Sequence, residues 1–350
     1  MPVNQQWILQ RRPEGRVKRS DFEFREVPVR PIEQGESLVK IRYLAMDPAT
    51  RGWMAPGGGY TEPLPLGGPV MGVTIGEIIE SRNPEIQPAT VVAGVGHWAR
   101  YMIAGPDQIS PVRTGNLGVL APMDTSSGHA LPMYLHAMGT SGGTAYYGMM
   151  EIARMKRGDR VLVSGAAGSV GSLATQIARL KGAAKVVGIA GGAVKCEEAT
   201  RDYGCDACID YKSTTDISAA IAREFPQGLD VYFDNVGGEI LEAAMANLAK
   251  GARIAICGMI SQYNDARPAP GPKNLWNLLV STARIEGFLA SDFFGTPACE
   301  AAYREIGQWL QDGKMTARLD IREEFDRVPE IFDELFSGGN HGRLIVEVPD

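Results

Sequence analysis

The segment VLVSGAAGSVGSLATQIARLKG, residues 161–182, decides the fold of this chain. Its first five residues, VLVSG, begin with an apolar run that predicts a buried strand. From residue 168 to 181 the apolar spacing is that of a helix, which Gly182 ends. A glycine-rich turn joins the two elements. A strand that passes through such a turn directly into a helix predicts the first strand–helix unit of a parallel sheet.

The same alternation continues for the next hundred residues. Apolar segments typical of strands occur at 185–190, 207–211, 231–236 and 253–258. Between them lie segments with helical spacing, which begin near residues 193, 215 and 239. Near-continuous apolar strands separated by helices are typical of a parallel sheet that is covered on both faces. Residues 126–295 are therefore predicted to form an α/β domain with a doubly wound parallel sheet.

The flanking segments have a different character. Residues 1–125 are rich in proline and glycine and contain short alternating segments, at 37–46 and 70–80, that predict a compact β domain. The last fifty residues predict a helix, a strand near 317–324, a second helix and a strand at 343–348. We expect these two strands to return to the first domain's sheet, so that residues 1–125 and 296–350 form one domain.

Composition excludes several classes of protein. A chain of 350 residues is too long for one ordinary core. It has 35 basic and 41 acidic residues, a formal net charge of −6, which gives no electrostatic footprint for nucleic acid. There is no run of about 18 apolar residues to span a membrane, and no targeting segment at the N-terminus. Its five cysteines are an odd number and form no disulfide framework. These features predict a cytoplasmic protein.

The pair Cys205 and Cys208 has the CxxC spacing of some zinc and redox sites. A structural zinc site needs four ligands, and no second cysteine or histidine pair follows at ligand spacing. The simpler interpretation is that Cys208 lies in the buried strand Ala207-Cys208-Ile209.

The glycine turn after the first parallel strand predicts a dinucleotide site. Gly168, Ser169, Val170 and Gly171 open the following helix, whose N-terminus supplies free N–H groups and a positive dipole for a pyrophosphate. The turn is a variant of the usual GxGxxG fingerprint, because two alanines replace its central glycine. It is not a phosphate-binding P-loop, because no Lys-Ser/Thr follows the last glycine.

The end of the second parallel strand favours NADPH over NADH. An NAD site usually has an acidic residue there that binds the ribose 2′-hydroxyl. Residues 188–195 contain no carboxylate; Gly191 and Gly192 leave room for a 2′-phosphate, and Lys195 can supply a positive charge.

The chain lacks the usual signature of a catalytic zinc site. None of its four histidines lies in a metal-binding motif, and residues 1–125 contain no cysteine. No GxSxG elbow is available for acyl transfer. Hydride addition to an activated alkene suits a metal-free site, because a hydroxyl can hold the developing enolate.

At this point the residues resemble a known family. The chain is similar to the zinc-free medium-chain dehydrogenase/reductase superfamily, and within it to prostaglandin reductases, plant alkenal double-bond reductases and bacterial curcumin reductases. The resemblance extends over essentially the whole chain and is most specific in DNVGG (234–238), ICGMISQYN (256–264) and GGAVKC (191–196). It implies a Rossmann NADPH domain, a GroES-like mainly-β catalytic domain and a homodimer.

The resemblance also implies particular cofactor and substrate contacts. Beyond the glycine turn, the cofactor residues would be Lys195, Tyr211, Asn235, Cys257, Gly258, Met259, Ile260, Ser261, Tyr263, Phe288, Leu289, Ala290 and Asn340. Tyr263, just past a strand's carboxyl end, is the candidate for the hydroxyl that supports the enolate. Met46, Trp53, Tyr60 and Trp98 are candidates for the wall of the substrate pocket.

One stretch departs from the family pattern. After Asp47-Pro48 the family commonly has Tyr-Met-Arg-Gly, whereas this chain has Ala49-Thr50-Arg51-Gly52. Two smaller residues beside the expected pocket suggest a differently shaped substrate site. Arg51 is either an anchor for a polar substrate end or part of a structural salt bridge.

The sequence thus predicts an NADPH-dependent reductase of the C=C bond of small α,β-unsaturated aldehydes and ketones. Two alternatives remain open. The same fold is found in quinone reductases, and a nucleotide-binding fold can also serve a protein that is not a catalyst.

Overall fold

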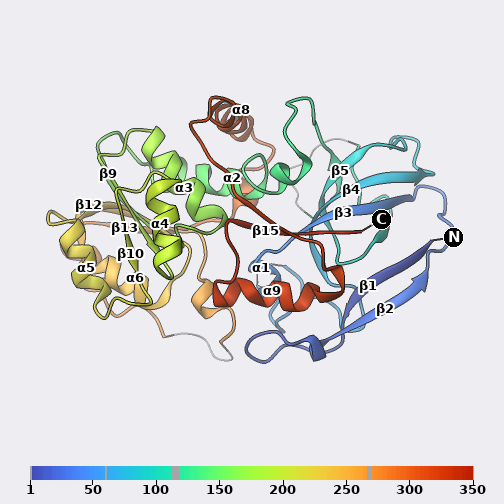
Figure 1. Cartoon of the computed structure of the whole chain (residues 1–350), viewed down its shortest axis with the longest axis horizontal. Helices are drawn as coiled ribbons and strands as arrows, with labels where there is room; N and C mark the ends of the chain where they lie inside the picture. Colours follow the sequence, from blue (N-terminus) through green and yellow to red (C-terminus); the bar gives the residue numbers. More distant parts are fainter. Residues whose placement is uncertain (1, 60, 112–117, 266–269, 350) are drawn as a thin grey trace. The chain divides into compact units, whose positions relative to one another are not determined.

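The computed structural model describes residues 2–59, 61–111, 118–265 and 270–349. Two compact units make up the chain (Figure 1). The first contains Met1–Leu135 and Leu319–Asp350, and the second contains His136–Arg318.

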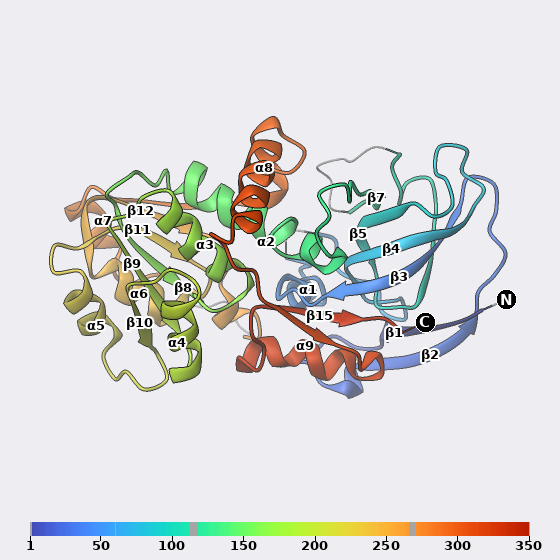
Figure 2. The ribbon, with the colours of Figure 1, turned by 45° about the horizontal axis from the view of Figure 1, so that its top comes forward.

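The second unit is built on a six-stranded parallel sheet of order β10-β9-β8-β11-β12-β13. Figure 2 labels five of these strands, β8 to β12, among the helices of the unit. The strands are β8 (Arg160–Ser164), β9 (Lys185–Ala190), β10 (Ala207–Asp210), β11 (Leu229–Asp234), β12 (Leu248–Ile256) and β13 (Arg284–Gly287). Every neighbouring pair is parallel. The predicted doubly wound sheet is therefore confirmed, and all six carboxyl ends meet at one edge.

Helices cover this sheet because its strands are apolar on both faces. The helices in contact with its strands are α3 (Ser169–Leu180), α4 (Ala193–Arg201), α5 (Ile217–Glu224), α6 (Gly238–Met245) and α7 (Leu275–Val280). Two further helices pack on this layer in turn: α2 (Thr140–Tyr146) contacts α3, and α8 (Pro297–Gln311) contacts α2. Leu162 of β8 packs in one core with Ile221 of α5 and Leu241 of α6. The adjacent Val161 and Val163 point to the other face and are also fully buried.

The first unit contains a mainly antiparallel sheet of order β14-β15-β3-β4-β5-β7, with β6 also paired to β3, and a separate pair β1-β2. Its strands are β1 (Val3–Leu9), β2 (Phe22–Pro28), β3 (Ser37–Ala45), β4 (Met71–Ser81), β5 (Val91–His97), β6 (Tyr101–Ala104), β7 (Ala121–Pro122), β14 (Leu319–Arg322) and β15 (Arg343–Glu347). Its helices include α1 (Ala49–Trp53) and α9 (Val328–Ser337). Since β15 pairs with β3, the predicted return of the last strands to the first sheet is confirmed.

The second boundary between the units differs from the expected one because of α8. The sequence assigned this helix to the first domain, but Tyr303 of α8 donates a hydrogen bond to Gly139 O at 2.9 Å. Glu305 of α8 accepts one from the Tyr146 hydroxyl at 2.8 Å and pairs with Lys181. The helix thus belongs to the second unit, and the boundaries lie at residues 135 and 318 rather than at 125 and 295.

Among the described residues, no helix combines the length and apolar character needed to cross a bilayer.

Candidate functional site

The predicted cofactor residues of the second unit gather at the carboxyl edge of the parallel sheet. Gly168 to Gly171 follow β8, Lys195 follows β9, Tyr211 follows β10, Asn235 follows β11, residues 257–263 follow β12 and residues 288–290 follow β13. Ligands of open α/β sheets bind at this edge. Asn340 is the exception, because it belongs to the first unit.

The turn between β8 and α3 depends on glycine. Gly165 has a φ of +62°, in the left-handed region. A Cβ added to Gly171 would lie 2.1 Å from Gly165 O, so no other residue fits there. Gly168 is the N-cap of α3 and has no side chain to cap the helix. The N–H groups of the first turn are therefore left for an anion.

Ser169, at the start of α3, is held by two side chains that the sequence did not single out. Its Oγ lies 2.7 Å from Ser141 Oγ and 3.2 Å from His136 Nδ1. His136 lies shortly before α2, and Ser141 lies in the first turn of α2. Neither residue was among the predicted site residues.

The candidate 2′-phosphate region joins the ends of β9 and β10. The Tyr211 ring lies so close to Gly191 that a Cβ there would be 2.8 Å from it. Asp210 Oδ1 accepts hydrogen bonds from Gly192 N at 2.7 Å and Lys212 N at 3.0 Å. The Gly192 amide is the main cause of the lowered pKa of Asp210. Lys195, half-buried, lies in the first turn of α4. The Asp210 carboxylate therefore holds the loop after β9 in place. This residue was not identified from the sequence.

A buried carboxylate organises the turn after β11. Asp234 Oδ1 accepts hydrogen bonds from Ser164 Oγ at 2.9 Å and from the Tyr232 hydroxyl at 2.7 Å. The backbone N–H groups of Val236 and Gly237 donate to the same oxygen. Burial raises the pKa of Asp234, and these four donors act in the opposite direction.

This network positions Asn235 at the sheet edge. Its backbone N–H donates to Ser164 Oγ at 2.9 Å, and its side-chain amide donates to Ser164 O at 2.7 Å. Ser164 and Asp234 are polar residues at the ends of two mainly apolar strands. This pattern could have identified both of them from the sequence.

The hydrogen bonding of Tyr263 leaves its hydroxyl group able to act as a donor. Its hydroxyl oxygen accepts a hydrogen bond from Met259 N at 3.1 Å, which leaves the O–H group to donate elsewhere. Gly258 permits this approach, because a Cβ there would lie 3.1 Å from the hydroxyl. Burial raises the pKa of Tyr263, so the phenol stays protonated at neutral pH.

The loop that carries Tyr263 is tied to the turn after β11. Ile260 N donates to Asn235 O at 3.3 Å, and Ser261 donates to Val236 O through its N–H at 3.2 Å and its Oγ at 2.6 Å. Burial raises the pKa of the neighbouring Cys257 to about 12, so its thiol is not an activated nucleophile.

The three cofactor-binding candidates after β13 differ in burial and in contacts. Phe288 makes edge contacts with Tyr147 and Phe233, at ring-centroid distances of 5.5 and 6.3 Å, which is a packing role. Leu289 is exposed and Ala290 half-buried.

The pocket candidates in the first unit are mostly core residues. Met46 and Trp98 are fully buried, and Trp53 is almost so, in one apolar cluster. This is the environment of core side chains rather than of an open wall. Tyr60 lies outside the described residues.

Arg51 and Asn340 bond to the backbone. The Arg51 guanidinium donates to Pro13 O at 3.0 Å and Gly15 O at 2.9 Å, which supports a structural role. Asn340 is buried and donates to Gly342 O at 3.0 Å within its own turn.

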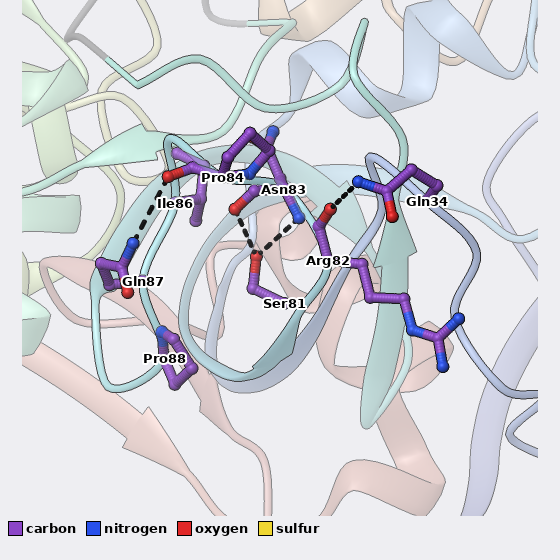
Figure 3. A pocket seen from close by; sticks show the side chains of 8 residues that line it. All are labelled: Gln34, Ser81, Arg82, Asn83, Pro84, Ile86, Gln87 and Pro88. Carbon is purple, nitrogen blue, oxygen red and sulfur yellow. Dashed lines mark hydrogen bonds between the residues drawn. The ribbon is translucent and has the colours of Figure 1, made fainter.

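An open hollow in the first unit contains none of the predicted residues. Figure 3 shows its lining by Gln34, Ser81, Arg82, Asn83, Pro84, Ile86, Gln87 and Pro88. Its polar groups bond to one another, as in the pair Gln34 Nε2 and Arg82 O at 3.2 Å (Figure 3). These bonds brace the loop after β4 and supply no acid–base chemistry.

In the parts of the chain that the structure describes, no three His, Cys, Asp or Glu side chains gather as a metal site would require.

The two units together define a class of protein. A chain that combines a doubly wound sheet, with a glycine turn at its first strand, and a mainly antiparallel β unit has the architecture of a two-domain dehydrogenase or reductase. Two family profiles agree: residues 5–112 match the N-terminal domain of oxidoreductase, and residues 169–309 match the family described as zinc-binding dehydrogenase.

Known proteins narrow the class. The chain is 34% identical to NADPH-dependent curcumin reductase of Escherichia coli, covering 99% of this chain and 97% of the relative. It is 35% identical to the NADP(+)-dependent 2-alkenal reductase of Nicotiana tabacum, with the same coverage. The structure of CurA in complex with NADPH from Vibrio vulnificus superposes with a TM-score of 0.88 at 32% identity, covering 99% of both chains. The chain belongs to the zinc-free medium-chain dehydrogenase/reductase group.

Proposed function

We propose that this protein is an oxidoreductase that uses NADPH to reduce the C=C bond of α,β-unsaturated aldehydes and ketones. The observation that carries the proposal is the Tyr263 hydroxyl, protonated and with its O–H group available, at the sheet edge where the cofactor-binding candidates gather. Full-length similarity to a curcumin reductase and a 2-alkenal reductase supports the same activity.

The residues at the sheet edge fit a phosphorylated dinucleotide. The uncapped start of α3 and the absence of a Cβ at Gly171 suit a pyrophosphate close to the backbone. Lys195 and Tyr211 would hold the 2′-phosphate beside Gly191 and Gly192. The rest of the cofactor would be held by Asn235, residues 257–261, Phe288, Leu289 and Ala290. Asn340 of the first unit is also proposed to contact the cofactor.

The chemistry divides between cofactor and protein. When bound, NADPH supplies the hydride. Tyr263 would donate a hydrogen bond to the substrate carbonyl oxygen, and this bond strengthens as that oxygen gains negative charge. The Met259 N–H group fixes the phenol oxygen so that its proton points away from the backbone. Solvent or a proton relay would then protonate the α-carbon.

Steady-state assays test the proposal. The absorbance of NADPH should fall when 2-alkenals or 3-alken-2-ones are added to the purified protein. Quinones reduced much faster than alkenals would favour the quinone-reductase alternative. NADPH binding without turnover of any activated alkene or quinone would favour a non-catalytic nucleotide-binding protein.

The proposed assembly is a homodimer in the cytoplasm, with no nucleic-acid or membrane partner. Two features of the second unit support a dimer: β13 is an edge strand, and α7 exposes Leu275, Trp276 and Leu279. An exposed apolar group and a strand at the edge of a sheet are each suited to contact with a second copy of the chain. The five free cysteines are consistent with a reducing compartment. Light scattering should give twice the mass of the chain.

A further inference from the structure

Three cysteine side chains meet where α4 packs on β10. The Cys208 thiol donates to Cys196 Sγ at a sulfur–sulfur distance of 3.0 Å. Gly188 of β9 leaves the space that these side chains fill. A Cβ there would lie 3.2 Å from Cys205 Sγ and 3.4 Å from Cys208 Sγ. All three are free thiols.

The three thiols differ in access and acidity. Cys196 and Cys208 are partly exposed, whereas Cys205 is 6% exposed. The hydrogen bond from Cys208 lowers the pKa of Cys196, so Cys196 has the most thiolate character of the pair. Burial raises the pKa of Cys205 to about 12, which makes Cys205 unreactive. Cys205 is therefore a matched internal control.

We propose that Cys196 and Cys208 are a redox site, at which a peroxide joins the two sulfurs in a reversible disulfide between α4 and β10. The Cys196 thiolate attacks a peroxide oxygen, the O–O bond breaks, and a sulfenic acid and hydroxide form. Cys208 Sγ then attacks the Cys196 sulfur and displaces its oxygen as water. The sum is two thiols and one hydrogen peroxide giving one disulfide and two waters. A dithiol then restores the two thiols by thiol–disulfide exchange and is itself oxidised to a disulfide.

The pair is already close to the required geometry. A disulfide bond is ~2.05 Å long, so the two sulfurs at 3.0 Å must approach by about 1 Å. α4 and β10 pack directly against each other, so the bond forms between neighbouring elements.

The consequence for the coenzyme rests on the proposed function. Cys196 directly follows Lys195, and Cys208 comes three residues before Tyr211, so the bond would link the two segments assigned to the 2′-phosphate. Asp210 already ties these segments through its bond to Gly192 N. A displacement of about 1 Å lengthens charge-assisted hydrogen bonds, and we expect NADPH to bind about ten-fold more weakly to the oxidised protein.

Peptide mapping tests the disulfide without reference to activity. The reduced protein is treated with hydrogen peroxide, its remaining thiols are alkylated, and its peptides are mapped by mass spectrometry without reduction. The expected product is a pair of peptides joined by a Cys196–Cys208 disulfide, whose mass is two hydrogen atoms below the sum of the two thiol peptides. It should form in the native chain and in Cys205→Ser. It should be absent from Cys196→Ser and Cys208→Ser. A Cys205–Cys208 link, or full alkylation of Cys196 after peroxide, would overturn the proposal.

Binding measurements test the consequence separately. The Kd of NADPH should rise about ten-fold on oxidation of the native chain and of Cys205→Ser, and return after dithiothreitol. It should not change in Cys208→Ser. An unchanged Kd in cross-linked protein would overturn the coupling to the coenzyme. If the reduced protein fails to bind NADPH, the proposed function fails, and the peptide map still decides whether the disulfide forms.

Discussion

Tyr263 is the single side chain on which the proposed chemistry depends most. Replacing it with phenylalanine keeps the ring and removes the donor. We expect kcat for 3-alken-2-ones to fall on the order of 10²-fold, as for other lost oxyanion donors. The Kd of NADPH should stay within about two-fold.

The matched control is Tyr211→Phe, which removes a hydroxyl at the proposed phosphate side of the same edge. It should change NADPH binding rather than kcat. Equal kcat for Tyr263→Phe and the native chain would assign Tyr263 a packing role.

Lys195 tests the coenzyme preference. In Lys195→Ala we expect NADPH to bind about ten-fold more weakly, which is the loss of a charge-assisted bond of ~1.4 kcal/mol. NADH, which lacks the 2′-phosphate, should bind as before. Titration calorimetry with both coenzymes measures the difference, and an equal loss for NADH and NADPH would remove Lys195 from the phosphate site.

At the scale of elements, the contact between the glycine turn and α3 is the most constrained feature. Gly171→Ala would place a Cβ 2.1 Å from Gly165 O, so the helix must move away from the turn. We expect a loss of about 1–3 kcal/mol in unfolding free energy together with weaker NADPH binding. Thermal denaturation with and without NADPH measures both.

Gly287→Ala is the control for this substitution, because a Cβ there has open space around it. Its melting temperature should stay close to that of the native chain. A Gly171→Ala protein that matched this control would show that the turn tolerates a side chain.

The end of β5 makes the first unit sensitive to acid. Burial lowers the pKa of His97 to about 4 from an unfolded value of 6.5. The unfolded chain therefore binds more protons between these values, and stability is present above pH 6.5 and is lost as the pH falls toward 4. At pH 5 the loss from this group is about 2 kcal/mol.

His97→Asn should remove that contribution. Urea unfolding at pH 7.5 and pH 5 should show a smaller loss in the variant than in the native chain. Identical pH dependence in the two proteins would mean that His97 is protonated in the folded state.

For the whole molecule, the sequence was sufficient to predict the features that follow from apolar periodicity and from the positions of glycine residues. The run of strands from β8 to β12 follows from apolar segments separated by helices, and the turn at Gly165 from glycine spacing. The return of β15 to the first sheet was also predicted correctly.

What the sequence did not predict depends on three-dimensional neighbours. The amphipathic pattern of α8 shows that one face is buried but not which unit buries it. Ser164 and Asp234 lie 70 residues apart and meet only because β8 and β11 are adjacent in the sheet. Trp98 is large and apolar in either setting, so its burial in the core could not be distinguished from a place in a pocket wall.

The fate of the transferred hydride tests the central claim most directly. The protein is given NADPH that carries deuterium at the transferable position of nicotinamide C4, together with a 3-alken-2-one, and the product is examined by NMR. We predict a saturated ketone with deuterium on the β-carbon and the carbonyl intact. Deuterium on the carbonyl carbon of an unsaturated alcohol, or a product without deuterium, would contradict the account.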